Sequence, residues 1–299
     1  MNKFVITTAT RNANLKASTI QIGKSDPENQ LPVSYIERAL LSARQDYPDY
    51  RIIVRDDAST DGTWEIIQRV AETFDVPIDI ASNPQRLGTI MNHNQISKLI
   101  DDDEIIVILD GDDQLAHRDV LTRLNMEYSD PEVWMTYGSF EYDECSRSKE
   151  PGASARGFAS QMNSHNRLSG FSCSHLRSYK KWLYDRIELE DLKYKDDFYP
   201  NINDYVVMFI MIEMAGAAHS RYIHDILYLY NNVNPYNEFK GPGAWPTDTE
   251  EQRAIKEQGE TKSGHSKILI HDEINELVDY FSAQRIYPPL QKAKDYPWK

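Results

Sequence analysis

The stretch that decides the fold is RIIVRDDASTDGT, residues 51–63. Its first five residues are rich in β-branched side chains and predict a short buried strand. The paired carboxylates of Asp56 and Asp57 follow at once, and an Asp-Gly turn leads into a helix predicted over Thr63 to Phe74. A strand that ends in acidic residues and leads into an amphipathic helix is typical of α/β proteins, whose ligands collect at the carboxyl ends of strands.

The same alternation continues on both sides of this stretch. Further strands are predicted at Phe4 to Thr8, Pro77 to Ala81 and Glu104 to Leu109, with helices at Tyr35 to Gln45 and Thr89 to Ile100. This β-α-β-α order requires a mostly parallel sheet flanked by helices. We therefore expect an α/β fold with acidic side chains gathered at one edge of the sheet.

The second half of the chain is less regular. It predicts strands at Val133 to Gly138 and Tyr222 to Tyr230, and helices at Ser174 to Ile187 and Asp204 to Ala215. From residue 238 the chain becomes polar, and Gly241-Pro242-Gly243 marks a linker before two further helices, near 248–260 and 266–284. The sequence thus predicts a helical C-terminal extension.

The composition excludes several classes of protein. Lys plus Arg number 33 and Asp plus Glu 47 among 299 residues, and the net charge of −14 disfavours binding to nucleic acid or anionic lipid. Two cysteines, Cys145 and Cys173, cannot form a disulfide scaffold or a thiolate-rich zinc site. The longest apolar runs, Ile105 to Leu109 and Val206 to Ile212, are too short to span a membrane. We expect a soluble, cytoplasmic protein without an integral membrane segment.

The strongest local feature is the acidic turn Asp110-Gly111-Asp112-Asp113, directly after a predicted strand. Carboxylates spaced in this way suit Mg²⁺ or Mn²⁺, which keep open positions for substrate phosphates. The alternative is a turn that merely caps a helix. Similarly, Thr60 or Asp61 could cap the helix that begins near Thr63, but such a cap does not explain Asp56 and Asp57.

These motifs resemble those of the family-2 glycosyltransferases. The run from Asp56 to Thr63 resembles the nucleotide-binding loop of that family, and Asp110-Gly111-Asp112-Asp113 resembles its Asp-x-Asp motif. Asn83-Pro84-Gln85-Arg86-Leu87-Gly88, followed by Asn94, is similar to its Asn-x-Gly and Arg-Asn segment. The resemblance covers residues 1 to about 125, is looser over 130–235, and is not seen beyond about 240.

The resemblance implies a GT-A fold and an inverting transfer of a sugar from a nucleoside-diphosphate sugar, with a uridine nucleotide as the default and Mn²⁺ or Mg²⁺ as cofactor. Asp112 would bind the metal, with Asp113 as the alternative ligand. The residues expected at the donor are Thr8, Thr10, Arg11, Asp57, Arg86 and Asp110. The implied domains are a catalytic domain over 1–237, with a donor half (1–125) and an acceptor half (126–237), and the extension over 238–299.

Such a transfer also needs a general base for the acceptor hydroxyl. In this family the base is an acidic residue that opens an apolar helix, and Asp204 fits that pattern. Its alternative role is that of an N-cap, and Asp196 and Asp197 are the fallback candidates. His175 and Arg177 are expected on the acceptor or phosphate side, although Arg177 could equally lie on a solvated helix face with Lys180 and Lys181.

Acceptors compatible with the sequence are a glycan, a lipid-linked glycan or a protein, whereas the net charge disfavours nucleic acid. The long segment 12–30 is expected to cover the donor site or to contact the acceptor. The aromatic Gln-x-x-Arg-Trp acceptor motif of the family is absent, which disfavours a processive polysaccharide synthase.

Two other functions remain open. A sugar-phosphate nucleotidyltransferase needs a glycine-rich phosphate loop after its first strand, and Thr7 to Asn12 contains no glycine. A non-catalytic domain that binds a sugar or a protein is the second alternative. The presence of Asp57, Asp112 and Asp204 together counts against it.

Overall fold

The computed structural model describes residues 1–14, 33–143, 173, 175–199, 202–231, 234 and 271–290. The strands are β1 (Lys3–Thr10), β2 (Tyr50–Asp56), β3 (Ile78–Ser82), β4 (Glu104–Ile108), β5 (Gln114–Leu115), β6 (Met135–Gly138), β7 (Glu141–Tyr142), β8 (Ser178–Lys180), β9 (Lys193–Tyr194), β10 (Asp197–Phe198), β11 (Ser220–Ile223) and β12 (Tyr228–Tyr230). The helices are α1 (Tyr35–Ser42), α2 (Thr63–Ala71), α3 (Thr89–Ser97), α4 (Val120–Tyr128), α6 (Lys181–Tyr184), α7 (Asn203–His219) and α9 (His271–Ser282), with the 3₁₀ helix η3 (Leu189–Leu192).

A seven-stranded sheet forms the centre of the fold, in the order β11-β6-β8-β4-β1-β2-β3. All neighbouring pairs are parallel except those that involve β8, which runs antiparallel to both β4 and β6. Thr10 pairs with Asp56, and Thr7 pairs with Ile108. The carboxyl ends of β1, β2 and β4 therefore meet at one edge, as the α/β prediction requires.

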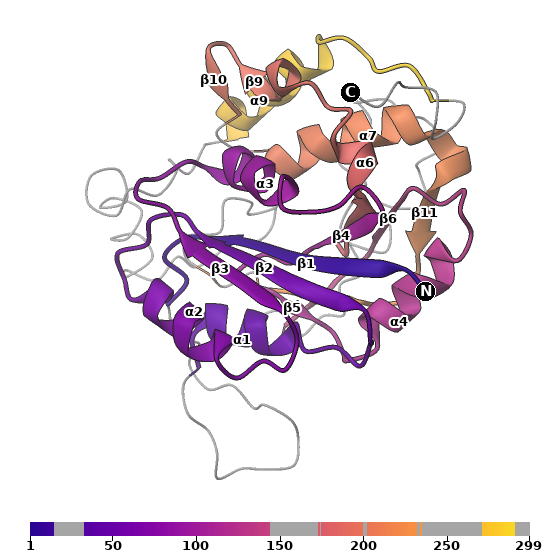
Figure 1. Cartoon of the computed structure of the whole chain (residues 1–299). Coiled ribbons are helices and arrows are strands. Elements are labelled where there is room, and N and C mark those ends of the chain that lie inside the picture. Colours follow the sequence, from indigo (N-terminus) through magenta and orange to yellow (C-terminus); the bar gives the residue numbers. More distant parts are fainter. Residues whose placement is uncertain are drawn as a thin grey trace.

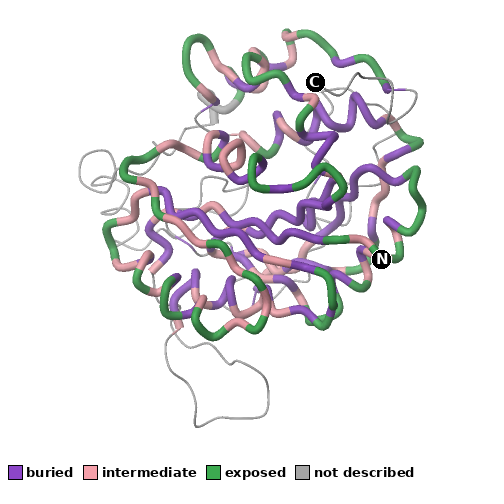
Figure 2. Tube along the Cα trace, viewed as in Figure 1, coloured by how far each residue is buried: buried purple, intermediate pink, exposed green. Residues whose placement is uncertain are grey.

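The sheet separates two hydrophobic cores, because alternate strand residues point to opposite faces. Val5, Ile53 and Ile106 belong to the core that includes α3, α6, α7 and α9. Phe4 and Ile52 belong to the core that includes α1, α2 and α4. Figure 1 shows these two groups of helices on opposite faces of the sheet, and Figure 2 shows the buried strands between their exposed outer surfaces.

A second, three-stranded sheet has the order β5-β12-β7. Its strand β5 follows the acidic turn at residues 110–113, so this small sheet lies beside the same edge. A short hairpin, β9-β10, packs with α9. Among the described residues, no helix has both the length and the apolarity that a membrane crossing needs.

Two predictions for the second half are wrong. Within the range predicted as one helix, Ser174 to Ile187, the structure has the strand β8 and the short helix α6, because Tyr179 of β8 pairs with both Ile106 and Met135 and completes the sheet. The strand predicted over Tyr222 to Tyr230 is two strands, β11 and β12, that belong to different sheets. The helix α9 lies within the predicted range 266–284, whereas the helix near 248–260 and most of segment 12–30 lie outside the described residues.

Candidate active site

The loop after β2 is organised by the carboxylate of Asp57. Its Oδ1 accepts hydrogen bonds from the backbone N–H of Leu87 at 2.7 Å and from Asn83 Nδ2 at 2.9 Å, and its Oδ2 accepts from the backbone N–H of Gly88 at 2.9 Å. Burial alone would raise the pKa of Asp57, but these bonds and one from Asn92 outweigh it and lower the pKa. Asp57 therefore remains ionised and fixes loop 83–88 against the end of β2.

The rest of the loop from residue 56 to residue 63 is also anchored locally. Asp61 Oδ1 accepts from the backbone N–H of Thr63 at 3.0 Å, but the N-cap of α2 is Gly62, so the predicted cap by Thr60 or Asp61 is wrong. Asp56 Oδ2 accepts from Ser82 Oγ at 2.7 Å and ties β2 to β3. Asp61 thus steadies the start of α2 from the position before its N-cap, while Asp56 and Asp57 brace the strand ends and the loop beside them.

Two guanidinium groups lie near the Asp57 loop. Arg11 Nη1 donates to the backbone carbonyl of Asp57 at 3.3 Å. Burial and the nearby charge of Arg86 lower the pKa of Arg11. Thr8 and Thr10 are buried in β1, and Thr8 Oγ1 has no hydrogen-bond partner within the described ranges. The structure thus brings the predicted donor-side residues to one end of β1 and β2.

The acidic turn after β4 packs tightly against the end of β1. A Cβ atom at position 111 would lie 2.3 Å from Thr10 Oγ1, so this close approach requires a glycine. The turn therefore places Asp110, Asp112 and Asp113 beside β1 and above the small sheet.

The two carboxyl groups Asp112 and Asp113 are poorly compensated. Desolvation and the charge of Asp110 raise the pKa of Asp112 to about 6. A hydrogen bond of 2.6 Å from Asn234 Nδ2 offsets this rise only in part. Burial and the charges of Asp112 and Asp110 raise the pKa of Asp113 well above its usual value. Asp113 Oδ1 accepts from the backbone N–H of Asn231 at 2.7 Å. Carboxylates in such surroundings favour a nearby cation.

Arg177 joins the acidic turn to the start of α7. Its Nη1 lies 2.7 Å from Asp204 Oδ2, and its Nη2 lies 3.0 Å from Asp110 Oδ2. The arginine is only 4% exposed, whereas the Asp110 and Asp204 side chains are 39% and 43% exposed. One buried cation thus holds two partly solvated carboxylates that are 94 residues apart in the sequence.

This geometry decides between the alternatives left open by the sequence. Arg177 and Lys181 are buried, so the solvated helix face predicted for them is wrong. The cap position of α7 is Ile202, and Asp204 lies in the first turn, where its Oδ1 accepts from the N–H of Tyr205 at 2.8 Å. Asp204 is thus not the N-cap.

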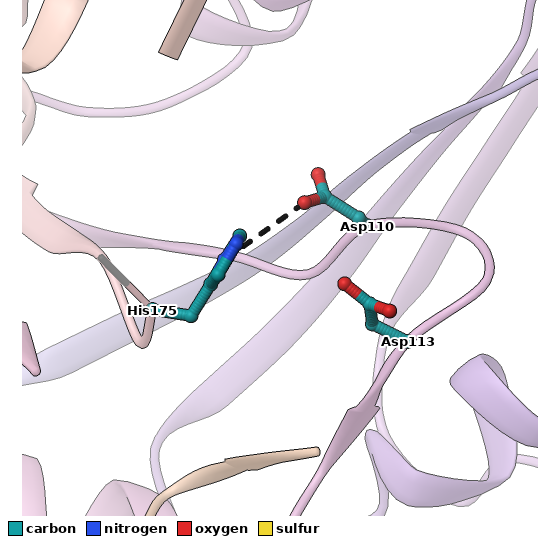
Figure 3. A group of neighbouring side chains, drawn as sticks. All are labelled: Asp110, Asp113 and His175. Atoms are coloured by element: carbon teal, nitrogen blue, oxygen red, sulfur yellow. Dashed lines mark ion pairs between the residues drawn. The ribbon is translucent and has the colours of Figure 1, made fainter. Parts of the chain in front are cut away.

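His175 is a neutral member of the cluster. Its Nδ1 lies 3.0 Å from Arg177 Nη2, and because a guanidinium only donates, Nδ1 accepts and the proton sits on Nε2. Burial and the charge of Arg177 lower the pKa of His175 well below its usual value. Nδ1 also lies 4.0 Å from Asp110 Oδ2. Figure 3 shows His175, Asp110 and Asp113 converging, and their potential metal-binding atoms lie within 4.8 Å of one another.

Sequence reasoning missed several side chains around the carboxylates. Burial lowers the pKa of His93 to about 4, although the charge of Asp110 opposes this shift. The next residue, Asn94, was noted in the sequence for its resemblance to the family motif, but it lines a separate cavity. Tyr228 Oη accepts from the backbone N–H of Asp110 at 3.1 Å. The run Tyr-x-Tyr-Asn-Asn at residues 228–232 is the signal that could have drawn attention to the end of β12.

The fallback candidates for the base lie elsewhere. Asp196 and Asp197 are exposed on the β9-β10 hairpin, which packs with α9. Asp204 is therefore the candidate base that the described residues bring into the cluster around Arg177.

Comparison with known proteins places the chain in a family. Residues 29–188, more than half of the chain, match the family described as glycosyl transferase family 2. The chain belongs to this family. A search of curated protein sequences found no match.

Solved structures share the fold. The S. aureus protein TarS (residues 1–349) in complex with UDP-GlcNAc aligns with a TM-score of 0.55 and 14% identity over 93% of this chain and 71% of that one. A mannosyltransferase from Pyrobaculum calidifontis, in complex with GDP-Man and Mn²⁺, aligns with a TM-score of 0.52 and 20% identity over 76% of this chain. The aligned part is 56% of the mannosyltransferase chain. At these identities the likeness establishes a GT-A-like fold.

The Arg177 bridge leads to a prediction about stability. Arg177→Met leaves Asp110 and Asp204 without their shared cation, and we expect the free energy of unfolding to fall by about 1–3 kcal/mol. This is less than the roughly 3–5 kcal/mol typical of fully buried pairs, because both carboxylates are partly solvated. Urea unfolding of the variant and the wild type measures the difference.

The matched control is Arg221→Met. Arg221 pairs with Asp130 at 3.5 Å, and both side chains are at least 35% exposed, so its loss should cost less than about 1 kcal/mol. Equal unfolding midpoints for Arg177→Met and Arg221→Met would contradict a structural role for the bridge.

Proposed function

We propose that this chain is a metal-dependent, inverting glycosyltransferase that moves a sugar from a nucleoside-diphosphate sugar to an acceptor hydroxyl, with Asp204 as the general base. The proposal keeps the division into a catalytic domain over 1–237 and an extension over 238–299.

One observation carries the proposal. Arg177 bridges Asp110, in the acidic turn expected at the donor, and Asp204, the expected base. A base must act close to the sugar-bearing end of the donor, and a shared guanidinium provides that proximity.

The donor end of the site supports a nucleoside diphosphate. Hydrogen bonds from the backbone of Leu87 and Gly88 hold Asp57 against its loop, and Arg11 and Arg86 add positive charge beside them. The two guanidinium groups repel each other, and a bound anion such as a diphosphate would reduce that repulsion. The donors in the two structural relatives carry different bases, uracil and guanine. The base and the sugar transferred by this chain are therefore questions for experiment, with UDP-sugars as the default.

The residues of the acidic turn fit a divalent cation. We assign Asp112 as the ligand because the family resemblance implies it, and Asp113, which lies with Asp110 and His175 in a group of possible metal ligands, is the alternative. Mn²⁺ or Mg²⁺ held there would neutralise charge on the departing diphosphate. Burial and the neighbouring carboxylates raise the pKa values of Asp112 and Asp113, and a bound cation would offset both effects.

The transfer itself requires one proton acceptor. The acceptor oxygen attacks the anomeric carbon from the face opposite the diphosphate, the bond to the phosphate oxygen breaks, and Asp204 takes the hydroxyl proton. Arg177 holds the Asp204 carboxylate in place and keeps it apart from Asp110. A glycan, a lipid-linked glycan or a protein can supply the hydroxyl. The family match favours this function over the nucleotidyltransferase alternative.

Asp204→Asn tests the function. Release of nucleoside diphosphate from a panel of UDP- and GDP-sugars with Mn²⁺ and mixed glycan acceptors should fall by about 100-fold or more, because the amide cannot take the proton. Nucleotide binding should remain. Asp196→Asn, which alters an exposed acid on the hairpin, serves as the control and should react at the wild-type rate. Wild-type turnover by Asp204→Asn would refute the base, and absence of any turnover by the wild type would favour a non-catalytic domain.

The pKa of Asp112 predicts how metal binding depends on pH. A cation binds the ionised carboxylate, so affinity for Mn²⁺ should rise as pH increases through about 6, where Asp112 loses its proton. Between pH 7.5 and pH 5 we expect about a tenfold loss of affinity, measured from the free Mn²⁺ signal in electron paramagnetic resonance. Asp112→Asn should bind Mn²⁺ weakly at both pH values. A pH-independent affinity in the wild type would exclude Asp112 as a ligand.

A further inference from the structure

Aromatic side chains cover one face of the small sheet. Tyr230 of β12 pairs with Tyr142 of β7, so their side chains lie on the same face, as do those of Phe140 and Tyr228 two residues away. The ring centroids of Phe140 and Tyr230 are 4.9 Å apart, and those of Phe140 and Tyr142 are 5.5 Å apart. Phe140, Tyr142 and Tyr230 are partly exposed, and we call these three residues the aromatic platform.

The platform adjoins the candidate active site. The ring of His175 lies 5.6 Å from that of Tyr230 and 4.5 Å from that of buried Tyr228, nearly parallel to both. The backbone N–H of Asn231, next to Tyr230, donates to Asp113. The platform is therefore next to Asp113 and His175 of the candidate active site.

The segment that carries Phe140 and Tyr142 follows β6, which lies on the other side of β4 from β2 in the large sheet. In the large sheet, β2 and the Asp57 loop are on one side of β4, and β8 and β6 are on the other. The small sheet is reached from the end of β6 through Phe140. A donor that extends from the Asp57 loop to the acidic turn would leave the platform uncovered. The platform could then contact the acceptor, which approaches the transferred sugar.

Among the described residues, the charges around the platform disfavour an anionic ligand. The acidic turn supplies three carboxyl groups, and the neighbouring cations Arg38 and Arg177 are paired with Asp143 and with Asp110 and Asp204. The lowered pKa of His175 keeps that ring neutral. A neutral ring with weakly polarised C–H groups fits this surface, because aromatic faces carry negative partial charge.

We propose that the aromatic platform is an acceptor subsite that binds a neutral pyranose ring by stacking. The inference rests on the proposed function and names its acceptor class as a carbohydrate. The donor's own sugar is also a pyranose in this proposal, so the experiment must separate the two sources.

The experiment uses the full chain with Mn²⁺ and a sugar nucleotide. Methyl pyranosides of glucose, galactose, mannose and N-acetylglucosamine are the probes, with acyclic sorbitol and anionic methyl glucuronide for comparison. Saturation-transfer NMR measures binding, and release of nucleoside diphosphate gives the half-saturating concentration of each probe and of the donor. At least one methyl pyranoside should bind more tightly than sorbitol and the glucuronide.

Variants identify the binding surface. Tyr142→Leu and Phe140→Leu remove a ring but retain bulk, and each should raise the half-saturating concentration of the pyranoside about tenfold. Tyr142→Phe keeps the ring face and should behave as the wild type. Tyr194→Leu, in a partly buried aromatic cluster on the hairpin beside α9, is the matched control and should have no effect on the pyranoside.

The outcomes separate this inference from the function on which it rests. If no nucleotide binds and no donor is turned over, the proposed function fails and the subsite fails with it. If the donor is turned over but both leucine variants bind the pyranoside as the wild type does, only the subsite is refuted. If the variants raise the half-saturating concentration of the donor alone, the platform holds the donor's sugar and the acceptor assignment is wrong.

Discussion

The repulsion among carboxylates at the edge of the sheet is the constraint on which the rest of the site depends. Asp57 is compensated by backbone amides, and Asp110 and Asp204 share the guanidinium of Arg177. Asp113 accepts a backbone N–H from the small sheet. Asp112 accepts a hydrogen bond from the Asn234 side chain, but its pKa remains raised, so an added cation is most useful there.

The order of strands arranges the chemistry along this edge. The Asp57 loop follows β2, the acidic turn follows β4, and Arg177 immediately precedes β8. A bound donor would therefore extend across the sheet from nucleotide to sugar. The antiparallel strand β8 matters here, because its reversed direction brings Arg177 to the same edge as the ends of its parallel neighbours. A parallel strand at that position would place Arg177 at the opposite edge.

The first half of the fold was predictable because its strands are short and apolar and alternate along the chain with helices. The acidic residues at 56–57 and 110–113 lie at strand ends in the sequence, so their gathering followed from parallel topology. The role of Arg177 could not be predicted in this way, since β8 has helix-like spacing and becomes a strand only by pairing with β4 and β6. The two-residue strands β5 and β7 are too short to show any periodicity. The aromatic platform therefore emerged only from the structure.

Protection by nucleotides tests the central claim most directly. Melting temperature would be followed with UDP, GDP, CDP and ADP, with and without Mn²⁺, in the wild type, Asp112→Ala and the exposed-carboxylate control Asp103→Ala. The account predicts that one nucleotide at 100 times its dissociation constant adds about 2.7 kcal/mol of stability. The gain should require Mn²⁺, disappear in Asp112→Ala and remain in Asp103→Ala. No protection by any nucleotide, or full protection in Asp112→Ala, would contradict the account.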